Sequence, residues 1–130
     1  MKISLLVLGS PLAGASADSA YHYADAALRA GHEIPGIFFY HEGVYHGNAF
    51  SAPAQDETDR VERWVELSRR GPSELVLCVA SALRRGILDQ AESSRRSRAA
   101  GNMHPAFNLA GLGLLVAAAG ECDRLLTFGT

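Results

Sequence analysis

The chain has 130 residues, a length that fits one domain able to bury roughly two-thirds of the surface of its unfolded chain. Its composition is 48% hydrophobic and 20% charged with 13 glycines, which excludes a disordered, collagen-like or disulfide-stapled chain. Twelve basic and fourteen acidic side chains give a net charge of −2 and exclude a general attraction for nucleic acid or anionic lipid. We therefore expect a single domain over residues 1–130 that folds without a cofactor and makes no direct contact with nucleic acid.

Short apolar runs alternate with longer periodic segments, which is the pattern of βαβ units around a parallel sheet. The first run predicts a strand over residues 2–8, apolar enough to be covered on both faces. The next segment predicts a helix that Ser16 or Asp18 caps and Gly31 ends. Its apolar face consists of Tyr21, Ala24, Ala27 and Leu28. A second strand is predicted over residues 33–40.

The second half of the chain continues the alternation after a long connection. Residues 41–55 contain glycines, a proline and two histidines of exposed type without a clean period, and so long a connection is often functional. A helix over 56–70, with Trp64 in the core, and a third strand over 74–80 follow. A polar stretch from 89 to 102, a helix over 109–119 and a last strand over 124–128 complete the chain. The predicted fold class is α/β, with an open, mostly parallel sheet and helices on both faces.

No apolar stretch approaches the length of a membrane span. The run from Ile3 to Leu8 is too short for a signal peptide, and the stretch from Leu109 to Ala119 falls short of the ~20 residues that cross a bilayer. We therefore expect a cytoplasmic protein. Because a reducing compartment keeps thiols free, Cys78 and Cys122 are both expected to be available for chemistry.

Cys78 is the leading candidate for a functional residue. It lies near the carboxyl end of the third predicted strand, and ligands of open parallel sheets bind outside the carboxyl ends of the strands. Arg84 and Arg85 begin a locally basic segment just downstream. Arginines near a cysteine can lower its pKa from about 8.5 to ~3.5–7.5 and create a nucleophilic thiolate, so both arginines are expected to activate the thiol. A small buried cysteine packed in a strand explains the same pattern, and the residues alone leave both readings open.

Several segments along the chain help to decide whether Cys78 is a reactive thiol or a buried structural residue. They are Ser19-Ala20-Tyr21, Gly31-His32-Glu33, Phe38-Phe39-Tyr40, Glu42-Gly43-Val44, Pro53 to Glu57 leading to Trp64, Cys78 to Gly86, Leu109 to Gly113, Cys122 to Leu125, and Phe128-Gly129. In these segments and their spacing the chain resembles the TusD/DsrE group of sulfur-relay proteins in the DsrE/DsrF-like family. The stretch from Cys78 to Gly86 carries the resemblance most strongly.

The resemblance implies a function, a site and partners. Cys78 matches the sulfur-accepting cysteine of the family, which makes the chain a sulfurtransferase subunit that holds sulfur as a persulfide. The implied assembly is a heterohexamer with two smaller paralogous subunits, served by an upstream persulfide donor and a downstream acceptor carrier. The favoured route is 2-thiolation of the tRNA wobble uridine. The alternatives are DsrE-type transfer in dissimilatory sulfur oxidation and a non-catalytic binding subunit of the same complex.

Two other candidate sites, a phosphate-binding loop and a metal site, lack residues that such sites need. Gly9 and Gly14 have the glycine spacing of a phosphate loop, but the lysine that such a loop needs is replaced by Ala15, so a plain connection is expected. His41, His46 and His104 lack a known ligand spacing, so solvated histidines are expected in place of a metal site.

Three further groups of residues remain as candidates for a pocket surface or for the core. His41, Tyr45 and His46 could shape a pocket or a partner surface near the strand ends. Cys122, at a helix-to-strand junction on the opposite edge of the sheet, is expected to be buried and outside the relay. Phe38 and Phe39 suit the core better than a subunit seam.

Overall fold

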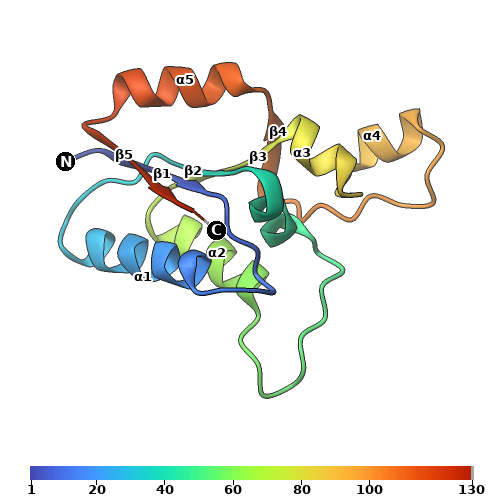
Figure 1. Cartoon of the computed structure of the whole chain (residues 1–130), viewed down its shortest axis with the longest axis horizontal. Coiled ribbons are helices and arrows are strands. Elements are labelled where there is room, and N and C mark those ends of the chain that lie inside the picture. The colour runs from blue at the N-terminus through green and yellow to red at the C-terminus, as the bar shows by residue number, and fades with distance from the viewer. Residues whose placement is uncertain (130) are drawn as a thin grey trace.

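The computed structural model describes residues 1–129 as a five-stranded parallel sheet with helices on both faces (Figure 1). The strands are β1 (Ile3–Val7), β2 (Gly36–Phe39), β3 (Glu74–Cys78), β4 (Phe107–Ala110) and β5 (Arg124–Phe128), in the spatial order β4-β3-β2-β1-β5. The helices are α1 (Ser16–Arg29), the 3₁₀ helix η1 (His41–Gly47), α2 (Arg60–Arg70), α3 (Val79–Arg84), α4 (Gln90–Arg95) and α5 (Leu112–Glu121). Every strand pair is parallel, so the predicted fold class is confirmed.

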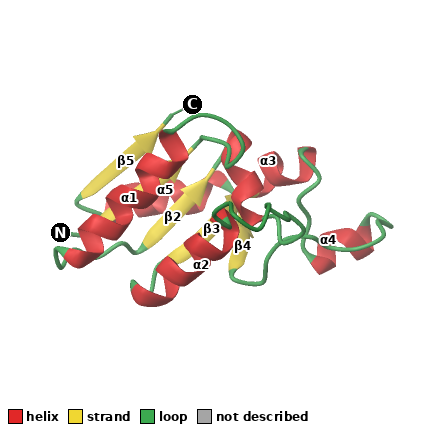
Figure 2. Ribbon diagram, turned by 90° about the horizontal axis from the view of Figure 1, so that it is seen from below, coloured by secondary structure: helices red, strands yellow, loops and turns green. Residues whose placement is uncertain are grey.

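Helices α1 and α2 lie on one face of the sheet and α5 lies on the other (Figures 1 and 2). The main core forms under α1 and α2, where Leu5, Ile37 and Leu77 point from the strands toward Trp64. These side chains are fully or almost fully buried. The α5 face is covered thinly, since no residue of α5 is buried. The two faces of the sheet therefore differ. The face under α1 and α2 forms a fully buried core, whereas on the other face apolar side chains of α5 remain exposed.

The first half of the chain departs from the prediction at the start of the second strand and at the caps of α1. The second strand begins at Gly36 instead of residue 33, because Pro35 has no N–H for the ladder, and Glu33 keeps only one isolated bridge to Lys2. The predicted caps of α1 are wrong: Ala15 occupies the N-cap position and Asp18 binds arginines of α2. Gly31 does end the turn after α1 with a positive φ of 89°, as predicted.

The long connection is partly ordered. Residues 41–47 form η1, and α2 begins at Arg60 instead of residue 56 because the Asp59 side chain accepts a hydrogen bond from the Glu62 N–H at 3.1 Å.

The second half holds three elements that the sequence did not predict, α3, α4 and β4. The third strand stops at Cys78, two residues early, since α3 begins directly after it. The polar stretch over residues 89–102, for which no helix was predicted, contains α4, and Asp89 is the N-cap residue of that helix. The apolar segment predicted as a helix from residue 109 instead begins as β4, which pairs with β3, and turns into α5 only after Gly111. The last strand, Arg124–Phe128, was predicted correctly.

No helix among residues 1–129 is both long and apolar enough to cross a membrane.

Candidate functional site

Cys78 ends β3 and serves as the N-cap residue of α3, so it lies at the carboxyl edge of the sheet. Its backbone is extended, with φ −61° and ψ 120°, and its register partner in β4 is Ala110. The residue is half-buried, and its thiol is not in a disulfide. The sequence placed Cys78 correctly at a strand end, and the residue is partly exposed there.

A small apolar cavity adjoins Cys78 between the sheet and α5. Its volume is about 10 Å³, which is about the space for a single water-sized atom. The lining comes from β1 to β4, from the residues that follow β2 and β4, and from α5: Leu6, Phe38, Phe39, Tyr40, Val76, Ala110, Gly111, Leu112 and Leu115. Leu112 is half exposed, so the cavity wall on the α5 side is also part of the molecular surface.

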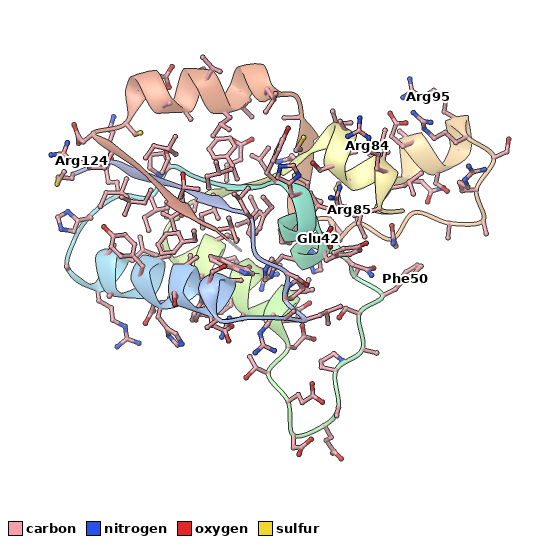
Figure 3. The ribbon with its side chains drawn as sticks, in the orientation of Figure 1. Glu42, Phe50, Arg84, Arg85, Arg95 and Arg124 are labelled. Carbon is pink, nitrogen blue, oxygen red and sulfur yellow. The ribbon has the colours of Figure 1, made fainter. Side chains whose placement is uncertain are left out.

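The two arginines that follow Cys78 have different surroundings. Arg85 Nε donates to Glu42 Oε1 of η1 at 3.0 Å, and its Nη1 donates to the Ser81 carbonyl at 3.2 Å. Arg84 is exposed and makes no ion pair among residues 1–129. Figure 3 shows Arg85 turned toward Glu42 and Arg84 turned away from it. Glu42, which the sequence analysis did not single out as a site residue, therefore neutralises one of the two predicted activating charges.

A backbone contact fixes η1 against α3 near the thiol. The His41 N–H donates to the buried Ser81 Oγ at 3.2 Å, and His41 adopts a left-handed φ of 50°. Its ring packs edge-on against Tyr40, with centroids 4.4 Å apart. Tyr40 lines the Cys78 cavity together with Phe38 and Phe39 of β2. The expected pocket residues His41, Tyr45 and His46 do not line that cavity.

His46 is completely buried, which corrects the expectation of a solvated histidine. Its Nδ1 accepts a hydrogen bond from Trp64 Nε1 at 3.1 Å, and its Nε2 lies 3.1 Å from the Gly9 carbonyl. An indole N–H can only donate, so the ring is the neutral tautomer with its proton on Nε2. Burial lowers the pKa of His46 to about 4. Both ring nitrogens are occupied, and the residue ties the loop after β1 to η1 and α2.

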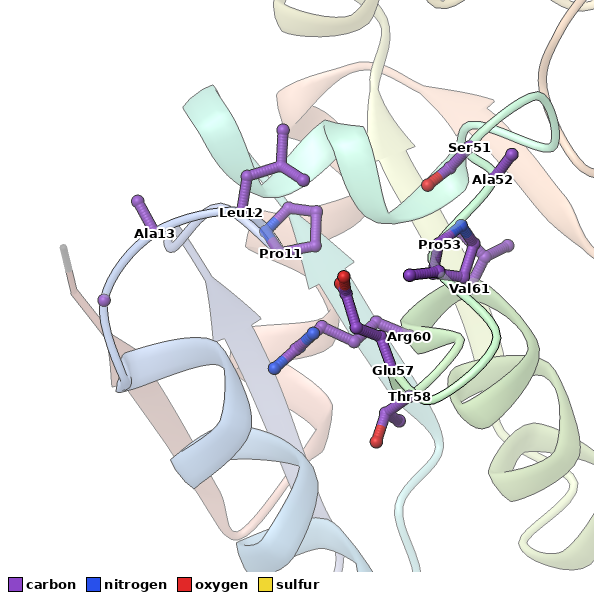
Figure 4. Close-up of a pocket in the computed structure, with 12 residues that line it drawn as sticks. Pro11, Leu12, Ala13, Ser51, Ala52, Pro53, Glu57, Thr58, Arg60 and Val61 are labelled. Carbon is purple, nitrogen blue, oxygen red and sulfur yellow. The ribbon is translucent and has the colours of Figure 1, made fainter.

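A second hollow lies away from Cys78, beside the loop between β1 and α1 (Figure 4). It measures about 480 Å³, and its walls include Pro11 and Leu12 from that loop, Glu57 from the segment before α2, and Arg60, the first residue of α2. The Arg60 guanidinium binds Asp18 through two hydrogen bonds at 3.0 and 3.2 Å. Hydrogen bonds from Arg60 hold the pKa of the Asp18 carboxyl far below its usual range. The cation that could meet a phosphate here is therefore already paired.

Cys122 ends α5 at the opposite edge of the sheet from Cys78, as predicted. It is only half-buried, which corrects the expectation of a buried thiol. The residue lines a separate hollow of about 240 Å³ together with Ser4, Phe38 and Leu114. The two thiols sit at opposite ends of the α5 face and do not share a cavity.

The described residues contain no cluster of three or more His, Cys, Asp and Glu side chains that could hold a metal ion. His104, the third predicted loop histidine, accepts the Ala106 N–H on Nδ1 and has its Nε2 3.3 Å from Glu62 Oε1. Its two nitrogens thus face protein groups.

Comparisons with known proteins agree along the whole chain. The model of the DsrE/DsrF-like family matches residues 1–128. The DsrE protein of Allochromatium vinosum is 46% identical over 129 residues, which cover 99% of this chain and 99% of that protein. Sulfurtransferase TusD of Yersinia pestis is 46% identical over 128 residues, 98% of each chain.

Two solved structures have a similar fold. The ychN protein of E. coli superposes with a TM-score of 0.77 at 16% identity, covering 98% of this chain and 99% of that one. A conserved protein of Bacteroides thetaiotaomicron gives a TM-score of 0.59 at 13% identity, covering 97% and 93%. At such low identity these likenesses concern the fold alone.

Proposed function

This chain belongs to the DsrE/DsrF-like family and is a sulfurtransferase of the sulfur-relay type, and on that premise we propose that Cys78 is the residue that carries the sulfur. One observation carries the proposal most directly: Cys78 lies half-buried at the carboxyl end of β3, with space for about one atom beside it. A thiol at such a place can meet a partner from solvent and still shelter a single added sulfur. Cys122 has no such position.

The transfer needs only thiol chemistry. The Cys78 thiolate attacks the outer sulfur of a donor persulfide, the donor S–S bond breaks, and the donor leaves as a thiolate. The new bond makes Cys78 a persulfide, and the proton stays with the transferred sulfur. An acceptor thiolate then attacks the outer sulfur of Cys78 in the same way. No external oxidant or reductant is consumed, because the sulfane sulfur keeps its oxidation state throughout.

We place this relay in 2-thiolation of the tRNA wobble uridine, with transfer of stored sulfur during sulfur oxidation as the second candidate. The names of the relatives support both routes, since a TusD and a DsrE protein match at equal identity. In either route the chain receives sulfur from one protein and gives it to another. The third candidate, a binding subunit with an incidental cysteine, predicts that Cys78 never gains sulfur.

The relay complex is proposed to be a heterohexamer with two smaller paralogous subunits. The α5 face supports a partner subunit there, because a helix that is apolar on all sides is normally covered by protein. Leu112, Leu114 and Val116 are 52%, 40% and 70% exposed on this helix. Glu121, at the end of α5, is its one charged residue. A 10-residue helix is too short to span a bilayer, which leaves protein as its cover.

Mass spectrometry of the intact protein tests the function. After incubation with a cysteine desulfurase, cysteine and an intermediate carrier, the chain should gain the mass of one sulfur atom that a reductant removes. Peptide mapping should place the gain on Cys78. A gain that persists in Cys78→Ser would rule out the assigned residue, and no gain on any residue would favour the binding subunit.

A further inference from the structure

We propose that residues 79–102, here called the arginine arm, are the docking surface for an acidic partner protein that exchanges sulfur with Cys78. This inference rests on the proposed function and adds the chemistry of the partner. The arm contains α3, α4 and the segments that join them to the body. It begins at the residue after Cys78, so a protein bound to the arm is placed next to the thiol.

The arm concentrates positive charge in an otherwise acidic chain. It holds five of the twelve basic residues, Arg84, Arg85, Arg95, Arg96 and Arg98, and only two carboxylates, Asp89 and Glu92. Its net charge is +3, whereas the chain as a whole carries −2, so the other residues together carry −5. Figure 3 shows Arg84, Arg85 and Arg95 grouped at this end of the molecule, with Arg124 at the far end.

Internal ion pairs leave most of this charge available. Glu92 pairs with both Arg95 and Arg96, so one carboxylate serves two guanidinium groups. Arg84 and Arg98 have no carboxylate partner among residues 1–129. The Arg95 side chain is 68% exposed. Only Arg85 is fully matched, through Glu42 from outside the arm. The unmatched arginines are therefore free to meet the carboxylates of a partner.

The arm is also built to hold its shape. Asn102 accepts the Leu88 N–H at 2.9 Å and donates to the Gly86 carbonyl at 3.0 Å. Ile87 and Leu88 are buried at the base of the arm. Buried Ser93 donates to the Arg98 carbonyl at 3.3 Å. In Figures 1 and 2, α4 extends beyond the sheet edge that β4 forms. A fixed, projecting set of charges loses little entropy when a partner binds.

The placement suits delivery of a sulfur atom. With a rise of about 1.5 Å per residue, the length of α3 puts Arg84 roughly 9 Å along the helix from Cys78. That distance is close to one Debye length, about 8–10 Å at 0.15–0.1 M salt, so the arm's field acts on an approaching group before contact and weakens as salt is added. An acidic protein with a reactive thiol or persulfide would be steered to the cysteine, and like charges would be repelled.

The charge distribution favours an acidic protein over a nucleic acid. Domains that bind phosphate backbones are generally basic overall, while this chain has a sequence pI of about 6.2. Outside the arm its net charge of −5 would repel the rest of a long polyanion. A protein presents its carboxylates on one limited patch, which matches a group of unmatched positive charges on one projecting arm.

Disulfide exchange with charged peptides tests the surface with a defined probe. Three short peptides, each with one cysteine activated as a 2-pyridyl disulfide, carry a run of Glu, Gln or Lys. The Cys78 thiolate attacks the peptide sulfur, the S–S bond breaks and 2-thiopyridine leaves as a thiolate, which is followed by its absorbance. In the Cys122→Ser background the Glu peptide should react about tenfold faster than the Gln peptide at low ionic strength, and the Lys peptide more slowly. Added salt should remove the differences.

Matched variants separate docking from thiol reactivity. Arg95→Gln with Arg98→Gln should bring the Glu peptide close to the rate of the Gln peptide, while alkylation by neutral iodoacetamide stays unchanged. Arg124→Gln removes a charge at the opposite end, where Arg124 Nη1 donates to the Asp123 carbonyl, and should leave every rate unchanged. Equal rates for the Glu and Lys peptides, or an equal loss in Arg124→Gln, would overturn the proposal.

Two further measurements keep the outcomes distinct. Transfer of sulfur to Cys78 from a low-molecular-weight persulfide tests the sulfur-carrier function alone. If Cys78 gains no sulfur, the carrier function is wrong, and the peptide rates still test the docking surface separately. Fluorescence anisotropy with tRNA should show no binding that depends on Arg95 and Arg98. Binding of tRNA that is lost in the double variant would reassign the arm to nucleic acid and refute the acidic partner.

Discussion

Trp64 Nε1 donates a hydrogen bond to Nδ1 of His46 at 3.1 Å, and both side chains are completely buried. The bond joins α2 to η1, and the other nitrogen of His46 continues it to the Gly9 carbonyl after β1. Three segments that converge at the carboxyl edge of the sheet are thereby fixed to one another. The edge that presents Cys78 thus rests on a buried polar chain as well as on apolar packing.

Replacing Trp64 with Phe should destabilise the fold. The substitution removes the indole donor and leaves Nδ1 of His46 buried without a partner, which costs about 1–3 kcal/mol, and the lost ring volume adds to this. Urea denaturation measures the free energy of unfolding. Phe50→Leu, at an exposed aromatic residue, is the matched control and should change it little. Equal stability of Trp64→Phe and the parent would show that the hydrogen bond contributes nothing.

Stability should decrease in mildly acid solution because of His46. The pKa of this residue is lowered from 6.5 to about 4 by burial, so between these values the unfolded chain binds a proton that the folded chain does not. The free energy of unfolding is then undiminished above about pH 6.5 and falls by up to about 3 kcal/mol as the pH drops toward 4. Denaturation at a series of pH values measures the slope. In His46→Asn this part of the slope should vanish, and an unchanged slope there would exclude His46 as its origin.

Cys78→Ser should abolish sulfur acceptance and leave the fold intact, because the exchange of oxygen for sulfur removes the nucleophile and little volume. Cys122→Ser should keep full activity, since that thiol lies at the other edge of the sheet. Sulfur transfer and circular dichroism of both variants give the comparison. Loss of transfer in a well-folded Cys122→Ser protein would reveal a resolving thiol.

The ion pair between Glu42 and Arg85 should restrain the reactivity of Cys78. Glu42 partly cancels the charge of Arg85, which otherwise favours an ionised thiol nearby. Glu42→Gln should therefore raise the rate of Cys78 alkylation at neutral pH, while Arg84→Ala and Arg85→Ala should lower it. The rates are measured with Cys122 replaced by Ser. If no substitution changes the rate, the two arginines do not activate the thiol.

Val116→Lys should prevent assembly without unfolding the chain. The Val116 side chain is 70% exposed on α5, so a lysine there is tolerated by the isolated subunit but would be buried unpaired in an interface. Light scattering of the chain co-expressed with the proposed paralogous subunits measures the mass of the assembly. Assembly of the variant at the mass of the parent complex would place the subunit interface elsewhere.

Local patterns in the sequence determined the fold class and the position of Cys78. A strand that is apolar nearly throughout must be covered on both faces, and this alone predicts a parallel sheet between helices. The prediction does not require knowing which strands pair. The last strand, Arg124–Phe128, was also located correctly, although it contains Arg124 and Thr127 and none of its residues is fully buried. The resemblance across the chain then assigned Cys78, because its motif is contiguous from residue 78 to residue 86.

Only the tertiary structure decided what depends on pairing across long separations. The segment Phe107–Ala110 is a strand because it adds to β3, a partner about thirty residues away, and its apolar run alone reads equally well as a helix. His46 can be buried because hydrogen bonds to Trp64 and to the Gly9 carbonyl satisfy its two ring nitrogens. These partners are 18 and 37 residues away in the sequence, so no local pattern predicts them. The bond from Arg85 to Glu42 spans 43 residues in the same way. The sequence determines which polar groups the chain contains. A buried polar group is stable only where folding brings its partner within hydrogen-bonding distance, and that depends on the tertiary structure.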